Sequence, residues 1–395
     1  MKVALILLIA CCLGAVIYSY VIYPVLLFVI SGFAQGICDI RYVLGKRERR
    51  SPSDSGLPAV AVVISAYNEE RHIRARIDNL LALDYPRELL HVYVGSDGSC
   101  DRTAEILAGF NQTAVRAYIF TENRGKASVL NDLVAHTCEP ILLFSDANTL
   151  FARDAVRRLV AHFCVSDVGA VSGELRLLRS SGDNQDSLYW RVEQILKFFE
   201  ARIGGLLGAN GAIYAIRREF WVPLATDTIC DDFCVAMSVA AAGQRLVYEP
   251  NAWAEEDTPD AISEEFHRRV RIGIGNFQAL FRHPEYLFCT PVATRFSYVS
   301  HKVLRWIAPH LLIVALSASL IMASLQSHPW LLLASLQIVV YSGAALLYAT
   351  SLGGVRLPSL FRILSFLFAL NLAFLLASWR YVSGNYRGSW KRTRR

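Results

Sequence analysis

The chain has 395 residues, a hydrophobic content of 54% and a mean hydropathy of +0.33. This composition is too apolar for an ordinary soluble enzyme, but a central stretch has a normal density of charges, so we expect membrane anchors around a soluble domain. The net charge of +6 comes mostly from two basic clusters beside apolar segments, which indicates an anionic membrane and no nucleic acid as partner.

The first apolar segment runs from Val3 to Ala34 without a charged residue. It exceeds the roughly 20 residues that span a bilayer, and it is about twice as long as the core of a signal peptide. We therefore predict an uncleaved transmembrane anchor over residues 1–40. The basic residues that follow, between Arg41 and Arg50, place the next domain in the cytoplasm by the positive-inside rule.

A soluble domain is predicted over residues 56–277, where short apolar runs alternate with segments of helical periodicity. The β-branched run at 60–65 is typical of a buried parallel strand. Further strands are expected at 91–95, 117–120 and 140–144, and helices at 73–81, 101–108, 127–136 and 233–242. The alternation of strands and helices predicts a parallel sheet with helices on both faces and a ligand crevice at the carboxyl ends of the strands.

Polar side chains follow three of these strands directly. Tyr67 and Glu69 come after the first strand, Asp97 after the second, and Asp146 after the fourth. Asp and Gly at strand ends are also ordinary turn formers, so each position alone has a purely structural explanation. Because the strand ends of a parallel sheet share one edge, we expect these side chains to meet in one crevice.

Three apolar segments close the chain, at residues 306–325, 330–350 and 360–379, and we predict three transmembrane helices within residues 305–380. Residues 278–304 mix aromatic and basic residues, which is typical of an interfacial amphipathic region, although a surface helix packed on the soluble domain also fits them. The basic tail, 381–395, conflicts with four crossings because it would then lie outside the cell. Either the last segment does not cross, or the tail is an exception.

The order of the polar motifs resembles that of membrane-bound family 2 glycosyltransferases with the GT-A fold, a Rossmann-like α/β fold for nucleotide-diphospho-sugars. This group includes cellulose, hyaluronan and poly-N-acetylglucosamine synthases. The matching stretches cover the soluble domain in the family's order: Val62–Glu70 (VVISAYNEE), Gly95–Ser99 (GSDGS), Arg124–Ala127 (RGKA), Ser145–Asn148 (SDAN) and Cys230–Phe233 (CDDF). Each stretch alone is a weak signal, but the ordered set is a strong one.

The resemblance implies a role for each donor-side residue. Tyr67, Glu69 and Asp97 would contact the uracil and ribose of a UDP-sugar, and Lys126 would lie near the nucleotide unless it is a solvated lysine at a helix start. Asp146 matches the first aspartate of the family's Asp-x-Asp motif, which holds Mg²⁺ or Mn²⁺ on the diphosphate. Asn148 replaces the second aspartate, so its amide oxygen is the second expected ligand.

On the acceptor side, Asp231 and Asp232 stand in the place of the family's Thr-Glu-Asp motif. The resemblance makes Asp232 the general base, and like-charge repulsion between the neighbours is expected to raise the pKa of one of them. Asp231 is expected to bind the acceptor or diphosphate, and it is also the expected N-cap of the following helix. Residues 268–272 stand in the place of the Gln-x-x-Arg-Trp motif of processive members: Arg271 is kept, but Arg268 replaces the glutamine and Ile272 the tryptophan, which weakens the case for polymerisation. Because Arg268 and Arg271 lie one turn apart, they are expected to bind the diphosphate or acceptor, or to be a solvated basic face.

These observations predict an inverting, metal-dependent glycosyltransferase of the inner (cytoplasmic) membrane, multi-pass, with its catalytic domain in the cytoplasm. The expected acceptor is a membrane-associated polysaccharide or oligosaccharide, and an exopolysaccharide assembly complex is an expected partner. Two alternatives stay open: a lipid acceptor such as ceramide, diacylglycerol or polyprenyl phosphate, and an inactive sugar-nucleotide-sensing scaffold. A transporter is excluded because the apolar segments lack ionisable residues near mid-bilayer.

Overall fold

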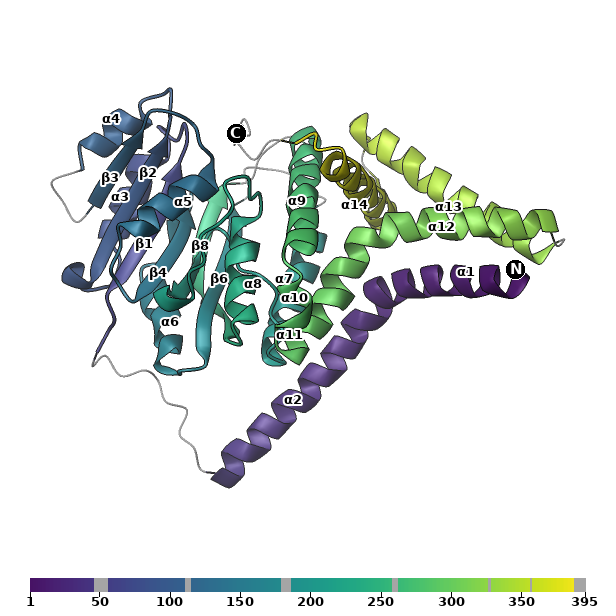
Figure 1. The fold of residues 1–395 in the computed structure, drawn as a ribbon, viewed down its shortest axis with the longest axis horizontal. Helices are drawn as coiled ribbons and strands as arrows, with labels where there is room; N and C mark the ends of the chain where they lie inside the picture. The colour runs from purple at the N-terminus through teal and green to yellow at the C-terminus, as the bar shows by residue number, and fades with distance from the viewer. Residues whose placement is uncertain are drawn as a thin grey trace.

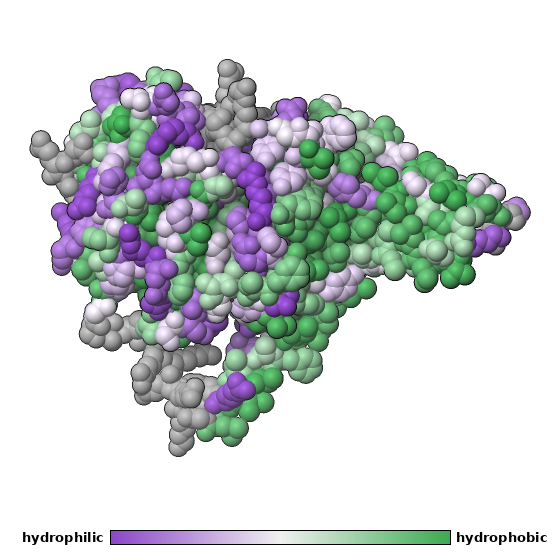
Figure 2. Space-filling view, viewed as in Figure 1, coloured by the Kyte–Doolittle hydropathy of each residue, from purple (hydrophilic) through white to green (hydrophobic). Residues whose placement is uncertain are grey.

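The computed structural model of the chain describes residues 1–45, 56–110, 115–178, 186–257, 262–325, 328–355 and 357–386. An α/β domain forms one side of the molecule, and a group of long helices extends from it (Figure 1). In the same view, hydrophilic side chains cover much of the α/β domain, whereas hydrophobic side chains gather over the long helices (Figure 2). The basic residues predicted to orient the anchor, 46–50, and most of the basic tail, 387–395, lie outside the described residues.

The α/β domain is built on one sheet, whose order among the described residues is β3-β2-β1-β4-β7-β6-β8-β5. The strands are β1 (Val60–Ala66), β2 (Leu90–Asp97), β3 (Val115–Phe120), β4 (Ile141–Asp146), β5 (Leu150–Phe151), β6 (Val168–Leu178), β7 (Tyr214–Arg217) and β8 (Arg245–Asp257).

Long and short helices flank the sheet and continue into the apolar part. They are α1 (Lys2–Ile17), α2 (Tyr23–Gly45), α3 (Ile73–Leu81), α4 (Thr103–Ala108), α5 (Lys126–Ala135), α6 (Ala155–Ala161), α7 (Asp186–Arg202), α8 (Asp231–Ala241), α9 (Ile262–Arg282), α10 (Glu285–Phe288), α11 (Val292–Ser297), α12 (Leu304–Leu325), α13 (Pro329–Leu352) and α14 (Ser359–Val382), with π-helical segments η1 (Tyr18–Ile22) and η5 (Tyr298–Val303). The C-terminal boundary predicted for the soluble domain, residue 277, falls inside α9.

The first half of the sheet is parallel, as predicted. β1 lies between β2 and β4, and its register places Ser65 beside Asp146 and Ala66 beside Ser96. The ends of these strands therefore share one edge of the sheet. The second half is mixed, which corrects the expectation of a parallel sheet: β7 pairs antiparallel with both β4 and β6, and β5 pairs antiparallel with β8.

Alternate side chains of β1 pack into two different hydrophobic clusters, one on each face of the sheet. Val60, Val62 and Ile64 pack with the cluster that includes α3 and α6 residues, whereas Ala61 and Val63 pack with the cluster that includes α5 and α8 residues. Because successive side chains of a strand point to opposite faces, an apolar run without polar interruptions is what a strand covered on both faces requires. This burial fixes β1 and thereby the edge at which its loop emerges.

A third apolar cluster joins the α/β domain to the long helices. It combines Phe233 and Met237 of α8 with Ile274 of α9, Trp306 of α12 and Phe374 of α14. Helix α9 runs beside α14 (Figure 1). The helix that begins with Asp231 and Asp232 is thus packed directly against the apolar bundle.

Four helical segments of the described chain are long and apolar enough to cross a membrane: Lys2–Arg41, Val292–Leu325, Pro329–Leu352 and Ser359–Val382. The first is bent at the π-helical segment η1, and a π-bulge is a known cause of such a kink. In Figure 1, α1 lies along α12, whereas α2 turns away along the α/β domain. The N-terminal apolar helix is therefore not one straight anchor.

Polar contacts hold the bent N-terminal helix to the α/β domain. The hydroxyl of Tyr23 donates to Glu200 Oε1 of α7 at 2.8 Å, and Glu200 also lies 2.7 Å from His301 Nδ1. Arg305 Nη1 donates to Glu193 Oε1, one further α7 carboxylate, at 2.8 Å. Charged groups that leave water need partners, and these contacts supply them. They fix α7 between the long apolar helices and the sheet.

Candidate active site

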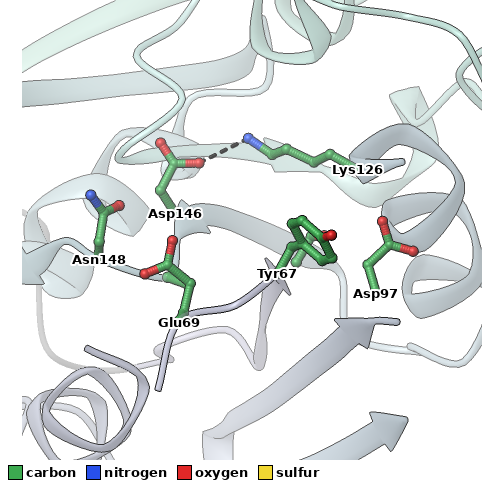
Figure 3. Close-up of a pocket in the computed structure, with 8 residues that line it drawn as sticks. Tyr67, Glu69, Asp97, Lys126, Asp146 and Asn148 are labelled. Carbon is green, nitrogen blue, oxygen red and sulfur yellow. Dashed lines mark hydrogen bonds and ion pairs between the residues drawn. The ribbon is translucent and has the colours of Figure 1, made fainter. Parts of the chain in front are cut away.

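Six of the predicted site residues line one pocket at the carboxyl edge of the sheet. Its lining consists of Ser65, Tyr67, Glu69, Asp97, Lys126, Asp146, Ala147 and Asn148. Figure 3 shows Asn148, Glu69 and Asp146 at one end and Asp97 at the other, with Tyr67 between them. The side chain of Lys126 extends from the Asp97 end towards Asp146. Residues up to 81 positions apart in sequence thus share a cavity because their strands are neighbours in the sheet.

Asp97 is almost fully buried, at 1% exposure, and both of its carboxylate oxygens accept backbone hydrogen bonds. Arg124 N–H donates to Oδ1 at 2.8 Å, and Gly125 N–H donates to Oδ2 at 2.9 Å. The loop before α5 is thereby tied to the end of β2. A carboxylate held in this way has remaining lone pairs in a fixed direction.

Gly98 makes this loop arrangement possible. Its φ is +64°, and a Cβ at this position would lie 2.5 Å from the backbone nitrogen of Asn123. We expect Gly98→Ala to displace the loop that binds Asp97, to weaken the nucleotide binding predicted from the sequence about tenfold, and to cost about 1–3 kcal/mol of stability. Isothermal titration with UDP and thermal unfolding of the purified protein measure both effects.

Gly243→Ala is the matched control for Gly98→Ala. Gly243 also has a positive φ, +80°, but no atom lies within 4 Å of the added Cβ. This control carries the backbone strain without the collision. Equal loss of nucleotide binding in both variants would show that strain, and not the loop, explains the effect.

Lys126 connects the pocket to the start of α8. Its Nζ lies 2.9 Å from Asp146 Oδ1 and 3.1 Å from Asp231 Oδ2, and its side chain is only 16% exposed. Burial by itself lowers the pKa of Lys126, but Asp146 and Asp231 raise it above its usual value overall. The alternative of a solvated lysine is wrong, because the ammonium is enclosed between two carboxylates.

Asp232 lies close enough to Lys126, Asp146 and Asp231 for their charges to act on it. Its Oδ2 accepts a hydrogen bond from Gly211 N–H at 3.0 Å, and a Cβ on Gly211 would lie 3.2 Å from Asp232 Oδ2 and 3.7 Å from Asp146 Oδ2. Gly211 therefore stands between the two carboxylates. Burial and the adjacent Asp231 raise the pKa of Asp232 to about 6, although Lys126 opposes the shift.

The predicted capping role of Asp231 is wrong. Helix α8 begins at Asp231 itself, its N-cap residue is Cys230, and no side chain makes the cap hydrogen bond. The carboxylate of Asp231 instead pairs with Lys126. A buried ammonium needs a countercharge more than a helix end needs one side-chain cap, because an unpaired buried charge costs far more than a cap contributes.

The donor set of the pocket fits a hard divalent cation. Asp146 and Asn148 offer oxygen atoms, and Asn148 Nδ2 donates to Glu256 Oε1 at 3.0 Å, which leaves the amide oxygen for a ligand. Among the described residues, no group of three His, Cys, Asp or Glu side chains forms a complete metal cage. Mg²⁺ and related ions are commonly held by one or two protein ligands together with substrate phosphates, so two oxygen ligands are sufficient.

Arg268 and Arg271 lie on α9 and do not belong to the described lining of the pocket. Arg268 is exposed, whereas Arg271 is partly buried. Burial lowers the pKa of Arg271, and the positive charge of Arg268 adds to this, while Asp231 and Asp146 oppose it. Arg271 is thus close enough to the site for the charges of Asp231 and Asp146 to act on it.

One buried residue of the site has no counterpart in the predicted set. Arg76 on α3 is fully buried and donates from Nη2 to Ser145 Oγ at 2.8 Å, next to Asp146. The sequence contains a signal for it: Arg76 falls on the apolar face of α3, between Ile73 and Leu80. A charge on the buried face of an amphipathic helix requires a partner inside the protein.

Comparison with known proteins shows to which family the chain belongs. The family model described as "Glycosyltransferase like family 2" matches residues 58–275, which is more than half of the chain. A poly-beta-1,6-N-acetyl-D-glucosamine synthase of Staphylococcus aureus (strain COL) is 27% identical over 254 residues, covering 62% of this chain and 60% of that protein. The synthase of Staphylococcus epidermidis is 26% identical over 234 residues, covering 56% of each chain. The chain thus matches about 60% or less of the length of these relatives.

A solved structure extends the likeness to the whole fold. A mannosyltransferase from Pyrobaculum calidifontis, in complex with GDP-Man and Mn²⁺, superposes with a TM-score of 0.67 at 23% identity, covering 98% of this chain and 99% of that chain. Its likeness shows the fold, and the predicted GT-A architecture with apolar helices at both ends is confirmed. The chain belongs to the glycosyltransferase-like family 2.

Proposed function

We propose that this glycosyltransferase is inverting and metal-dependent, and that it moves a sugar from a UDP-sugar to a membrane-associated polysaccharide or oligosaccharide. The observation that carries the proposal is the shared site of Asp97, Asp146 and Asp232, with Lys126 enclosed between Asp146 and Asp231. A transfer of this kind needs separate groups for the nucleotide, for the diphosphate and for the acceptor hydroxyl. In the proposal, Asp97 serves the nucleotide, Asp146 the diphosphate and Asp232 the acceptor hydroxyl.

The donor would bind along the pocket. Asp97, fixed by two backbone N–H groups, would accept hydrogen bonds from the uracil or ribose, beside Tyr67 and Glu69. Lys126 would turn its charge towards the diphosphate. Asp146 and Asn148 would hold Mg²⁺ or Mn²⁺, which when bound neutralises charge on the leaving diphosphate.

Asp232 would then remove the proton of the acceptor hydroxyl as this oxygen attacks the anomeric carbon. A base with a pKa of about 6 is ionised at neutral pH and is still basic enough to accept a proton. The hydrogen bond from Gly211 holds its Oδ2 in place. Asp231, paired with Lys126, keeps the negative charge beside it that raises its pKa.

This assignment predicts the pH dependence of transfer. Only the ionised form of Asp232 accepts a proton, so kcat/KM should fall about tenfold for each pH unit below about 6 and should level off above it. Initial rates at subsaturating donor across this range, with UDP binding measured in parallel, give the profile. A rate that stays constant down to about pH 5 while UDP binding is unchanged would remove Asp232 from the reaction.

We further propose a multi-pass protein of the inner membrane, with residues 56–277 as a cytoplasmic catalytic domain. Supporting this, α8 packs against the apolar helices, so an acceptor at the membrane would meet Asp232. Residues 278–304 would form the interfacial region, and an exopolysaccharide assembly complex would receive the product. The names of the Staphylococcus relatives support a polysaccharide product.

The experiment that tests this function supplies the purified, detergent-solubilised protein with radiolabelled UDP-sugars, one GDP-sugar and a membrane extract, with Mn²⁺, Mg²⁺ or EDTA. We expect label from one UDP-sugar in a water-soluble saccharide, only with a metal. Label in a chloroform-soluble product would replace the saccharide acceptor by a lipid. Transfer from the GDP-sugar alone would overturn the donor assignment.

A further inference from the structure

Side chains of helix α3 form hydrogen bonds with both ends of the proposed metal-binding turn. The turn is the segment Ser145–Phe151, which contains Asp146 and Asn148 and joins β4 to β5. Arg76 donates from Nη2 to Ser145 Oγ at its first residue, at 2.8 Å. The last residue of the turn, Phe151, makes two backbone hydrogen bonds with the side chain of Asn79. Asn79 Oδ1 accepts from Phe151 N–H at 2.8 Å, and Asn79 Nδ2 donates to Phe151 O at 3.0 Å.

Arg76 also holds the two ends together. Its Nη1 donates to Asn79 Oδ1 at 2.8 Å, and its guanidinium carbon lies 4.0 Å from the centroid of the Phe151 ring. The planar fork of arginine can bind two oxygens and stack on an aromatic ring at once, whereas a lysine ammonium cannot. Burial lowers the pKa of Arg76 to about 9, with Asp146 opposing the shift, so the group is charged at neutral pH.

A second chain of contacts runs from Ser145 towards Asp232. Ser145 Oγ accepts from Arg76 and donates to the carbonyl oxygen of Ala212 at 2.8 Å. The residue before Ala212 is Gly211, whose N–H donates to Asp232 Oδ2 at 3.0 Å. The hydroxyl of Ser145 therefore links the turn that carries Asp146 to the loop that holds Asp232.

We propose that Arg76 is a positioning residue, which through Ser145 fixes Asp146 and the metal-binding turn relative to the 211–212 loop and Asp232. The inference rests on the proposed function, because it gives Arg76 a task only if Asp146 holds the metal. Groups that orient a metal ligand without touching the metal typically change its affinity 10- to 100-fold when they are removed. A small rotation of the turn would also change the spacing of the two carboxylates.

The test measures Mn²⁺ binding in the presence of UDP, from the spectroscopic signal of free Mn²⁺, for the full-length protein in detergent. Arg76→Lys keeps a cation but loses the fork and the stacking, and Ser145→Ala removes the hydroxyl that Arg76 reaches. Each is expected to weaken Mn²⁺ binding at least about tenfold, with UDP binding in EDTA unchanged within about twofold. Because the two substitutions remove the same Arg76–Ser145 contact, the loss of Mn²⁺ affinity in the double variant should be smaller than the product of the two single losses.

Arg74→Lys is the matched control, since Arg74 is an exposed arginine on the same helix, and it should leave Mn²⁺ binding unchanged. Unchanged Mn²⁺ binding in Ser145→Ala would overturn the inference. So would a loss of UDP binding in EDTA that parallels a lowered thermal midpoint, because Arg76 would then only support the fold. If the unmodified protein shows no UDP-dependent Mn²⁺ binding, the metal role of Asp146 itself is wrong, and the inference falls with it.

Discussion

Asp232→Asn should reduce sugar transfer about 10²- to 10⁴-fold while UDP binding is retained, because the variant keeps the shape of the side chain but cannot accept a proton. It should also stabilise the protein. The pKa of Asp232 is raised to about 6 from its usual 3.8, so above about pH 6 its ionised form destabilises the folded state, and a neutral amide removes that repulsion. Transfer rates, titration with UDP and thermal unfolding at neutral pH measure the three effects.

The control for Asp232→Asn is Asp227→Asn. Asp227 is a nearby carboxylate in the segment before α8, and it pairs with Arg282 at 2.7 Å near the surface. We expect this control to keep full activity and to gain no stability, since its pKa is lowered by Arg282 and not raised. Turnover of Asp232→Asn equal to that of the unmodified protein would remove the base assignment.

Asp146→Asn should abolish the metal dependence of donor binding and reduce transfer by about 10²-fold or more. The amide keeps one oxygen but removes the formal charge, and a metal on a leaving group contributes several kcal/mol, where each 1.4 kcal/mol is tenfold. The substitution also removes one of the two carboxylates that pair with Lys126 and leaves the pair with Asp231. Titration with UDP, with and without Mn²⁺, separates the metal effect from binding of the nucleotide.

Asp154→Asn is a suitable control for Asp146→Asn, because Asp154 follows the same segment but pairs with Arg158 near the surface. It should bind UDP and Mn²⁺ as the unmodified protein does. Retention by Asp146→Asn of the full enhancement of UDP binding by Mn²⁺ would contradict the assignment of Asp146 as a metal ligand.

The parallel half of the fold follows from local pattern, whereas the mixed half does not. Unbroken apolar runs such as 60–65 specify a strand covered on both faces, and alternation with helices specifies parallel neighbours. The position of β7 between β4 and β6 depends on pairing between segments far apart in the sequence. The bend of the N-terminal helix lies at the π-helical segment Tyr18–Ile22, which is followed by Tyr23 with its distant partner Glu200, whereas an apolar run alone predicts only a straight helix.

Most of the pocket residues were predictable because they lie at or just after the end of a strand, and the sheet determines where strands end. Lys126, at the start of α5, was instead predicted from the family resemblance. The ion pair between Lys126 and Asp231 was not, since the local sequence around Asp231 also fits an N-cap, and only the packing of α8 beside α5 decides between the two. Arg76 was missed although it interrupts an apolar helix face. Its partner Ser145 is 69 residues away and becomes visible only in three dimensions.

The configuration of the first product at the anomeric carbon tests the central claim most directly. If one base, Asp232, activates the acceptor on the face opposite the leaving diphosphate, a single displacement must invert the anomeric centre. Nuclear magnetic resonance of the product formed from an α-linked UDP-sugar should therefore show a β-linkage. An α-linked product would contradict the single-displacement mechanism and the role given to Asp232.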